Sequence, residues 1–317
     1  MKPSPTSTGL ATAVLSAAAF GTSGAFMKPL LAAGWTPAAA VAARALTAGL
    51  VLLPFMLLSL RGQGAALWRG RWRVLGMGAV GVAFTQLAYY AAITRVPVST
   101  ALLVEYLAPL LLVGWTWVAT RRRPGRLVLT GSALAIGGLL LVIGPGAVQA
   151  VDPLGLLLAF AAAVGCAAYF VLAARPADGL PPVALAGSGL LIGGLGLLVT
   201  GATGLLPLAT TTGPVTLFDT SVPWWLPLLI VAVIGTAVAY ATGIAASARL
   251  GSRLASFVGL LEVVFAALFA WLLLGEHLTT RQLLGGTLIL AGITAVRAER
   301  PAAPAPAPTT REPVVAN

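Results

Sequence analysis

The sequence contains few of the residues that soluble enzymes and metal proteins rely on. Only 9% of its 317 residues are charged, and it has one cysteine, Cys166, and one histidine, His277. A single cysteine excludes an intrachain disulfide, and a histidine without clustered ligands does not make a metal site. It also lacks the GxxxxGK[ST] loop of ATP-driven pumps and the GxSxG and HExxH motifs of hydrolases. We therefore expect no metal and no other cofactor.

Hydrophobic residues dominate instead, at 59% of the chain. Soluble domains contain about 25% charged residues, far more than this chain. Apolar runs of about 20 residues, enough to cross a ~30 Å hydrocarbon core, recur along nearly its whole length. The sequence predicts an all-α polytopic membrane protein whose immediate partner is the lipid bilayer.

Ten of these runs are expected to form transmembrane helices. They lie at about 10–32, 37–60, 74–94, 98–119, 127–145, 153–174, 182–204, 223–247, 254–275 and 282–297. Five spans fall in residues 10–146 and five in residues 152–297, which we treat as two repeats. Residues 1–9 and the Ala/Pro-rich residues 298–317 are expected to be disordered tails.

The basic residues predict how the chain is oriented. The net charge is +11, but the arginines stand in short loops between apolar runs, where they orient helices and do not form a nucleic-acid surface. With the N-terminus in the cytoplasm, fifteen of the 19 lysines and arginines fall on the cytoplasmic side and two, Arg95 and Arg281, fall outside. We expect both termini in the cytoplasm and a location in the cytoplasmic (inner) membrane of a bacterium.

The two halves share features in the same order. Ser99 precedes Glu105 by six residues, and Ser256 precedes Glu262 by six. Further matches at constant offsets are Gly81 with Gly235, Arg95 with Arg249, Gly21 with Gly165, and Phe26 with Phe170. Because five spans is an odd number, the second half enters the membrane upside down. Such inverted repeats build the alternating-access sites of transporters.

Several segments resemble one transporter family. Gly21–Lys28 reads GTSGAFMK, Tyr89–Ser99 reads YYAAITRVPVS, and Leu102–Pro109 reads LLVEYLAP. In the second half, Leu272–Glu276 (LLLGE) is followed by Leu284–Gly292 (LGGTLILAG). Together with the ten-span layout over about residues 12–297, these segments resemble the drug/metabolite transporter superfamily in its ten-helix EamA-type branch. The LVEYLAP segment looks like the amino-acid and metabolite exporters of that branch.

The resemblance implies a central cavity lined mainly by the first, third, fourth, sixth, eighth and ninth spans. It also implies that the chain moves a small organic solute, mostly outward. The first half departs from the family pattern at Arg121–Arg123, which stand where the fourth span would end in Gly-Glu. That position lies at the cytoplasmic edge, away from a central cavity.

Four ionisable residues lie inside predicted spans: Lys28, Arg44, Glu105 and Glu262. Lys28 is near the outer end of its helix, where its ammonium group is expected to snorkel to the interface. A charge at the helix centre costs about 2.5–3.5 kcal/mol on insertion scales, so such residues usually face protein. At 1.5 Å per residue, Arg44 and Glu105 both lie roughly 10–12 Å from the outer face. We expect them to form a structural pair or to bind a charged end of the substrate. No basic residue of the second half shares the depth of Glu262, which is either a protonated, hydrogen-bonded carboxyl or a proton-coupling site.

Uncharged polar residues on the same spans complete the candidate site. They are Thr22, Ser23, Gln86, Tyr89, Tyr90, Tyr169 and Tyr240. An amide, hydroxyls and aromatic faces suit an amphipathic organic solute better than a bare ion. Each of them is expected either to contact the solute or to form a hydrogen bond between helices.

The sequence thus favours a secondary active transporter that exports an amino acid or a related metabolite, with protons as the candidate coupling ion. Efflux of drugs or toxic compounds, and uptake of a solute by the same fold, remain as alternatives. A channel or scaffold is disfavoured by inverted repeats that carry buried carboxylates. An intramembrane enzyme is disfavoured because no nucleophile stands with a base.

Overall fold

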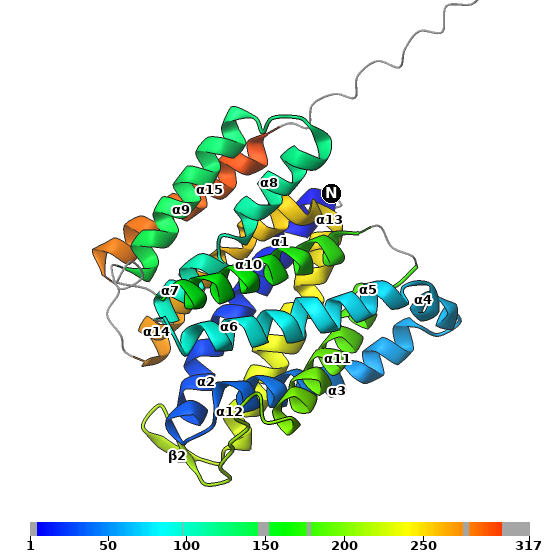
Figure 1. Cartoon of the computed structure of the whole chain (residues 1–317), viewed down its shortest axis with the longest axis vertical. Helices are drawn as coiled ribbons and strands as arrows, with labels where there is room; N and C mark the ends of the chain where they lie inside the picture. The colour runs from blue at the N-terminus through cyan, green and yellow to red at the C-terminus, as the bar shows by residue number, and fades with distance from the viewer. Residues whose placement is uncertain (1–4, 97, 145–151, 176–178, 275–278, 300–317) are drawn as a thin grey trace, which may run out of the picture.

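The computed structural model describes residues 5–96, 98–144, 152–175, 179–274 and 279–299, which form a bundle of helices with one small hairpin (Figure 1). The helices are α1 (Pro5–Gly21), α2 (Ser23–Ala32), α3 (Pro37–Ser59), α4 (Gly64–Arg69), α5 (Arg71–Gly76), α6 (Thr85–Ile93), α7 (Val98–Glu105), α8 (Ala108–Thr120), α9 (Arg126–Ile143), α10 (Pro153–Ala174), α11 (Pro182–Ala202), α12 (Trp225–Ala232), α13 (Ala239–Gly259), α14 (Leu261–Leu274) and α15 (Thr280–Ala298). π-helical segments at Met77–Phe84 and Val233–Val238 join α5 to α6 and α12 to α13.

Eight helical segments in the described part of the chain are long and apolar enough to cross a membrane. They are Thr6–Ala32, Pro37–Ser59, Arg71–Ile93, Thr100–Thr120, Arg126–Ile143, Pro153–Ala174, Pro182–Ala202 and Trp225–Gly259. These segments cover the first eight expected spans, which confirms the helical membrane class. The expected spans at 254–275 and 282–297 correspond to the end of α13 with α14, and to α15.

The last of the eight segments is interrupted inside. Trp225–Gly259 has 35 residues, and a straight helix of that length would extend about 50 Å, well beyond a ~30 Å hydrocarbon core. Gly251, at φ +77° and ψ 162°, is not helical, and the chain changes direction there. Glycine adopts this positive φ without the steric cost that a Cβ imposes. The residues after Gly251 therefore form a separate helical piece that leads towards α14.

Local sequence fixes where several helices begin. Asp152 caps α10, its carboxylate accepting a hydrogen bond from the Leu154 N–H at 3.0 Å. Thr279 and Gln282 form a reciprocal capping box at the start of α15. Pro153 stands at the start of α10, where the missing N–H leaves no helical hydrogen bond unmade.

Four features, two helix ends and two loops, differ from the sequence-based expectation. Helix α1 begins at Pro5, so residues 5–9, expected in the N-terminal tail, form its first turn. Gly9 packs against Leu250 of α13, so this first turn contacts another helix. The loop 205–222 contains a hairpin of β1 (Val215–Leu217) and β2 (Thr220–Val222), a small exception to an all-α fold. Helix α4 occupies the loop between the second and third expected spans, and α15 extends one residue past the expected end of the second repeat.

Equivalent helices of the two halves pack against each other in opposite directions. Helix α9 lies along α15, with Gly131 against Gly292 and Gly138 against Gly285. The residue number rises along α9 while it falls along α15, so these two fifth helices are antiparallel. The same is true of α3 and α11, the second helices. The first helix of each half packs on the third span of the other, α1 on α13 and α10 on α6. This exchange is what an inverted repeat produces.

The π-helical segments also follow the repeat. They end at Phe84 and Val238, which are separated by the same offset of 154 residues as Gly81 and Gly235. Near each segment a threonine hydroxyl donates to the carbonyl five residues earlier, Thr85 to Val80 at 2.8 Å and Thr236 to Val231 at 2.9 Å. Widened helical turns of this kind often lie at functional sites. In each half the π-helical segment ends two residues before a predicted site residue, which is Gln86 in the first half and Tyr240 in the second.

The contact between α9 and α15 depends on glycine, and one adjacent pair of positions tests this. A Cβ at Gly138 would lie 2.5 Å from the Gly285 carbonyl oxygen, whereas a Cβ at Gly137 would meet nothing within 4 Å. We expect Gly138→Ala to lower stability by about 1–3 kcal/mol, the usual cost of overpacking. Gly137→Ala should be neutral or slightly stabilising, because alanine favours helix. Thermal unfolding of both variants in detergent measures the difference, and equal melting temperatures would contradict this packing.

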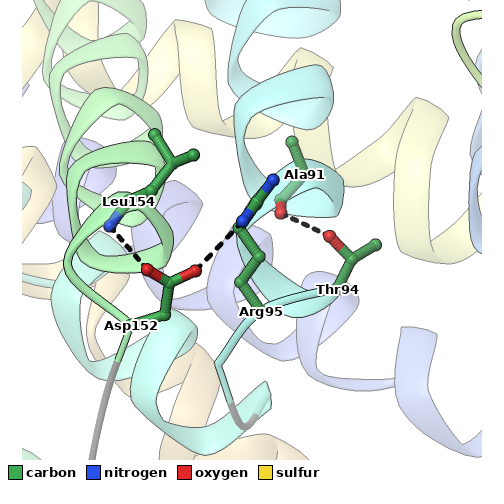
Figure 2. Close-up of polar contacts among 5 residues, drawn as sticks. All are labelled: Ala91, Thr94, Arg95, Asp152 and Leu154. Carbon is green, nitrogen blue, oxygen red and sulfur yellow. Dashed lines mark hydrogen bonds and ion pairs between the residues drawn. The ribbon is translucent and has the colours of Figure 1, made fainter.

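Arg95 and Asp152 connect the two halves at the end of the bundle (Figure 2). The Arg95 Nη1 donates to the Asp152 Oδ2 at 3.1 Å, so one carboxylate both caps α10 and pairs with the end of the third span. The Leu154 N–H, and secondarily Arg95, hold the pKa of the Asp152 carboxyl below its ordinary value of 3.8. Both side chains are largely exposed, so the effect on stability is small.

This cap predicts a pH dependence with a definite sign. Because the pKa of Asp152 is lower in the folded state, its carboxylate stabilises the fold at pH values above the ordinary pKa of 3.8. This stabilisation is lost as the pH falls through the lowered pKa of the folded state. We expect Asp152→Ala to lower the melting temperature at pH 7 more than Asp152→Asn, since asparagine still caps. Between pH 7 and pH 3 the melting temperature of the wild type should fall towards that of Asp152→Asn. A difference in melting temperature that stays constant across that range would show that the Asp152 charge contributes nothing to stability.

Candidate functional site

The two repeat-related carboxyls lie at breaks in their helices. Glu105 is the last residue of α7, and the chain turns through residues 106 and 107 before α8 begins. Glu262 lies in the first turn of α14, directly after the interruption at Leu260. A carboxylate is stabilised at a helix N-terminus, where free N–H groups leave a partial positive charge. Both glutamates are half-buried, so each remains accessible from within the bundle.

These two carboxyls share one site. Glu105 and Glu262 lie within electrostatic range of each other. The Tyr106 hydroxyl forms a hydrogen bond with the Glu262 carboxyl, so the residue after one glutamate contacts the other. The break after Glu105 makes this possible, because it lets two consecutive side chains serve the same cluster. A site at the interface of the two halves is the arrangement that inverted repeats build.

The structure places the basic partner differently from the sequence-based expectation. Arg44, on α3, acts electrostatically on Glu262, and the structure records no ion pair between Arg44 and Glu105. Among the described residues no ion pair joins Arg44 to Glu262 either, so the expected Arg44–Glu105 pair stays a prediction, while Arg44 lies within electrostatic range of Glu262. A basic neighbour of Glu262 was sought only in the second half, whereas Arg44 comes from the first.

Tyrosines surround the carboxyls. Tyr89 and Tyr90, both on α6, lie near Glu105. Their rings are in edge contact, with centroids 5.5 Å apart. Tyr169 on α10 and Tyr240 on α13 lie on the Glu262 side, with ring centroids 5.6 Å apart. Arg44 lies within electrostatic range of Tyr90 and of Tyr240. All four predicted tyrosines thus gather at the candidate site.

The other three predicted residues are Thr22, Ser23 and Gln86, whose place at the site stays a prediction. Thr22 donates to the Ala19 carbonyl at 2.7 Å, within its own helical region. Ser23 donates to the Gly235 carbonyl at 3.3 Å and so forms a bond between α2 and the π-helical segment of the second half. Gln86 is half-buried beside Thr85, with no side-chain hydrogen bond among the described residues. For Thr22 and Ser23 the structure favours a helix-stabilising role.

Sequence reasoning missed two members of the cluster. Tyr106 bonds Glu262, and Cys166 on α10 lies within electrostatic range of both carboxyls. Tyr106 was overlooked because on an unbroken helix it would point about 100° away from Glu105. Pro109, three residues on, was a signal that the helix is interrupted here. Cys166 has no partner cysteine, and no site signal was available for it.

The composition of the cluster limits its chemistry. Two carboxyls and one guanidinium leave one uncompensated negative charge when all three are ionised. A buried charge without a partner is costly, so the site favours a bound proton or a cationic group. In the described ranges no three His, Cys, Asp or Glu side chains are grouped to hold a metal ion. His277 and Glu276 lie outside these ranges.

The comparisons with known proteins give the family. The model of the EamA-like transporter family matches residues 7–144 and again residues 153–298. The chain belongs to the EamA-like transporter family. The two matches are the two halves that the sequence pattern predicted, and each contributes one of the two carboxyls.

One relative agrees with this assignment, and one solved structure shares the fold. The chain is 28% identical over 259 residues to an uncharacterized inner membrane transporter, YicL, of Salmonella typhimurium strain LT2, covering 79% of this chain and 81% of that protein. A solved crystal structure matches with a TM-score of 0.70 and 23% identity, covering 93% of this chain and 98% of that chain. At that identity the structural match shows the fold alone. Family and relative indicate a membrane transporter that moves a small molecule.

Proposed function

We propose that this EamA-like transporter exports a small amphipathic metabolite, an amino acid or a related amine-bearing compound, across the cytoplasmic membrane in exchange for protons. The observation that carries the proposal is the shared site of Glu105 and Glu262, to which Arg44 supplies one balancing charge. A proton or a substrate ammonium group would neutralise the remaining carboxylate. Because one charge cannot accept both, binding of either partner would displace the other, which is the requirement for antiport.

The surroundings of the carboxyls support an amphipathic solute. Tyr89, Tyr90, Tyr169 and Tyr240 offer aromatic faces beside the charged groups. An ammonium group gains from aromatic faces as well as from a carboxylate. Arg44 could in turn hold a substrate carboxylate, which favours a zwitterion over a simple cation.

The proposal includes ten membrane crossings with both termini in the cytoplasm. The Gly251 break supports it, because it divides a 35-residue segment into two pieces that can each serve a separate crossing. The antiparallel packing of equivalent helices supports an odd number of crossings in each half. A tag after Asn317 should be inaccessible in intact cells. Labelling of that tag from outside would contradict this topology.

Transport by purified protein in liposomes tests the function. We expect saturable movement of at least one compound from a panel of amino acids, related amines and amphipathic drugs. The rate should rise when the compartment that receives the solute is made acidic, because protons then move in the opposite direction. Saturable transport of no compound on the panel would contradict the exporter proposal. Transport at the same rate with and without the pH gradient would contradict the proposed exchange for protons.

A further inference from the structure

A small cavity opens onto Glu262 of the carboxyl site. It is enclosed by α1, α10, α13 and the first turn of α14, and offers about 50 Å³ of space to water-sized molecules. We call it the inner cavity; Ser16, Tyr169, Gly243, Ser247, Gly259 and Glu262 are among the residues that line it. One water needs roughly 10–15 Å³ by this measure, so the inner cavity has room for a few waters and no organic solute.

The inner cavity exposes hydroxyls that the protein leaves without a hydrogen-bond partner. The Tyr169 hydroxyl and the Ser247 Oγ are buried and bond to no atom of the described chain. Ser16 is different, because its hydroxyl donates to the Ala239 carbonyl at 2.7 Å. A buried polar group without a partner costs about 1–3 kcal/mol. Two such groups facing one enclosed space point to bound water.

The position of the inner cavity connects Glu262 to one end of the bundle. Ser247 lies four residues before the Gly251 break, and Tyr169 lies five residues before the end of α10. The start of α1 is at the same end, where Gly9 packs against Leu250. Arg249 and Arg253 stand on either side of the Gly251 break, which places this end on the cytoplasmic side in the proposed topology. Glu262 forms part of the cavity wall.

We propose that the inner cavity holds water bound by Tyr169 and Ser247, and that this water carries protons between the cytoplasm and Glu262. The inference rests on the proposed proton exchange, and it adds the route and the side from which the proton arrives. In each step a proton leaves one water for the next and finally joins a Glu262 carboxylate oxygen, with hydrogen bonds reversing along the way. Tyr106, Glu105, Arg44, Cys166, Tyr169 and Tyr240 are the ionisable groups within electrostatic range of Glu262.

Hydroxyl-radical footprinting of the full-length protein in nanodiscs tests for the water, since radicals formed from bound water modify the side chains beside it. Tyr169 and Tyr240 are matched for exposure, both at 8%, but only Tyr169 is among the residues lining the inner cavity. A Cβ at Gly243 would lie 2.9 Å from the Tyr169 hydroxyl, so Gly243→Ala narrows the cavity. We expect this variant to slow modification of Tyr169 severalfold and to leave Tyr240 unchanged.

Gly114→Ala is the control, because its Cβ would meet nothing within 4 Å. It should leave both tyrosines at wild-type rates. The same Tyr169 rate in wild type and Gly243→Ala would overturn the water site. So would slowing of Tyr169 by sodium, when potassium at the same concentration has no effect, because the cavity would then hold a sodium ion.

Infrared measurement of hydrogen–deuterium exchange tests the link to Glu262. The carboxyl band that Glu262→Gln removes belongs to Glu262, and its shift in D₂O reports arrival of deuterons. Ser247→Ala and Tyr169→Phe should each slow that shift severalfold relative to Gly114→Ala. Unchanged rates in both variants would overturn the route. The measurement needs no substrate, so a failed transport assay with slowed exchange would reject the proposed function and retain the route.

Discussion

Glu262→Gln is expected to lower pH-gradient-driven transport in liposomes by at least about tenfold. Glutamine keeps the size of glutamate and can still bond the Tyr106 hydroxyl, but it cannot exchange a proton or balance an ammonium group. Hydrogen bonds that involve a charged group contribute about 1.5–3 kcal/mol, which corresponds to roughly 10- to 100-fold in rate or affinity. What remains of transport should no longer respond to the gradient.

Two further variants test whether the loss of transport in Glu262→Gln is due to the Glu262 charge. Glu299→Gln removes an acid beyond the end of α15, outside the site, and should behave as wild type. Tyr106→Phe removes the hydroxyl that bonds Glu262 without changing any charge, so it should weaken transport while the pH dependence persists. Full pH dependence in Glu262→Gln would remove this residue from the coupling mechanism.

Arg44→Gln should destabilise the protein, and removal of Glu262 should restore much of the loss. Truncating one partner of a fully buried charged pair costs roughly 3–5 kcal/mol, and less is expected here because Arg44 and Glu262 are half-buried and lie within electrostatic range without a direct ion pair among the described residues. In Arg44→Gln the site loses the basic side chain that lies within electrostatic range of Glu262. The double variant Arg44→Gln/Glu262→Gln has one uncompensated carboxylate, as the wild type does, so its melting temperature should rise above that of Arg44→Gln.

A double-mutant cycle decides between the two glutamates as partner of Arg44. The structure predicts a larger coupling energy for Arg44 with Glu262 than for Arg44 with Glu105, because the recorded electrostatic interaction joins the first pair. Thermal unfolding of the single and double variants provides both coupling energies. A larger value for Arg44 with Glu105 would restore the pair that depth alone suggested and contradict the arrangement described above.

Hydropathy was sufficient to predict the helices, but not where they break. Apolar runs of about 20 residues have few stable alternatives to a helix in a membrane, so the segments from α3 to α11 follow directly from the sequence. The break at Gly251 was not predictable, because the chain has 37 glycines and most of them permit a helix. Packing of the surrounding helices selects the one that adopts a positive φ.

The candidate site could likewise be predicted only in part, because hydropathy gives the depth of each residue but not how the helices pack. Counting residues placed Glu105 about 10–12 Å from the outer face and Glu262 about 12 Å from the inner face. In a ~30 Å core these depths leave only about 6–8 Å between the two carboxyls along the membrane normal. The sequence therefore already implied that the glutamates could meet. Which cation joins them, and the role of Tyr106, depend on helix packing and on the turn after Glu105, which no local pattern specifies.

The central claim is that proton and substrate compete for one carboxyl site built from both repeats. Release of protons on substrate binding measures this directly, using purified protein in weakly buffered detergent and a compound that the liposome panel shows to be transported. We predict that the wild type acidifies the solution when the compound binds, and that Glu262→Gln binds it without acidification. Saturable binding to the wild type with no release of protons, at any pH between 5 and 8, would contradict the account.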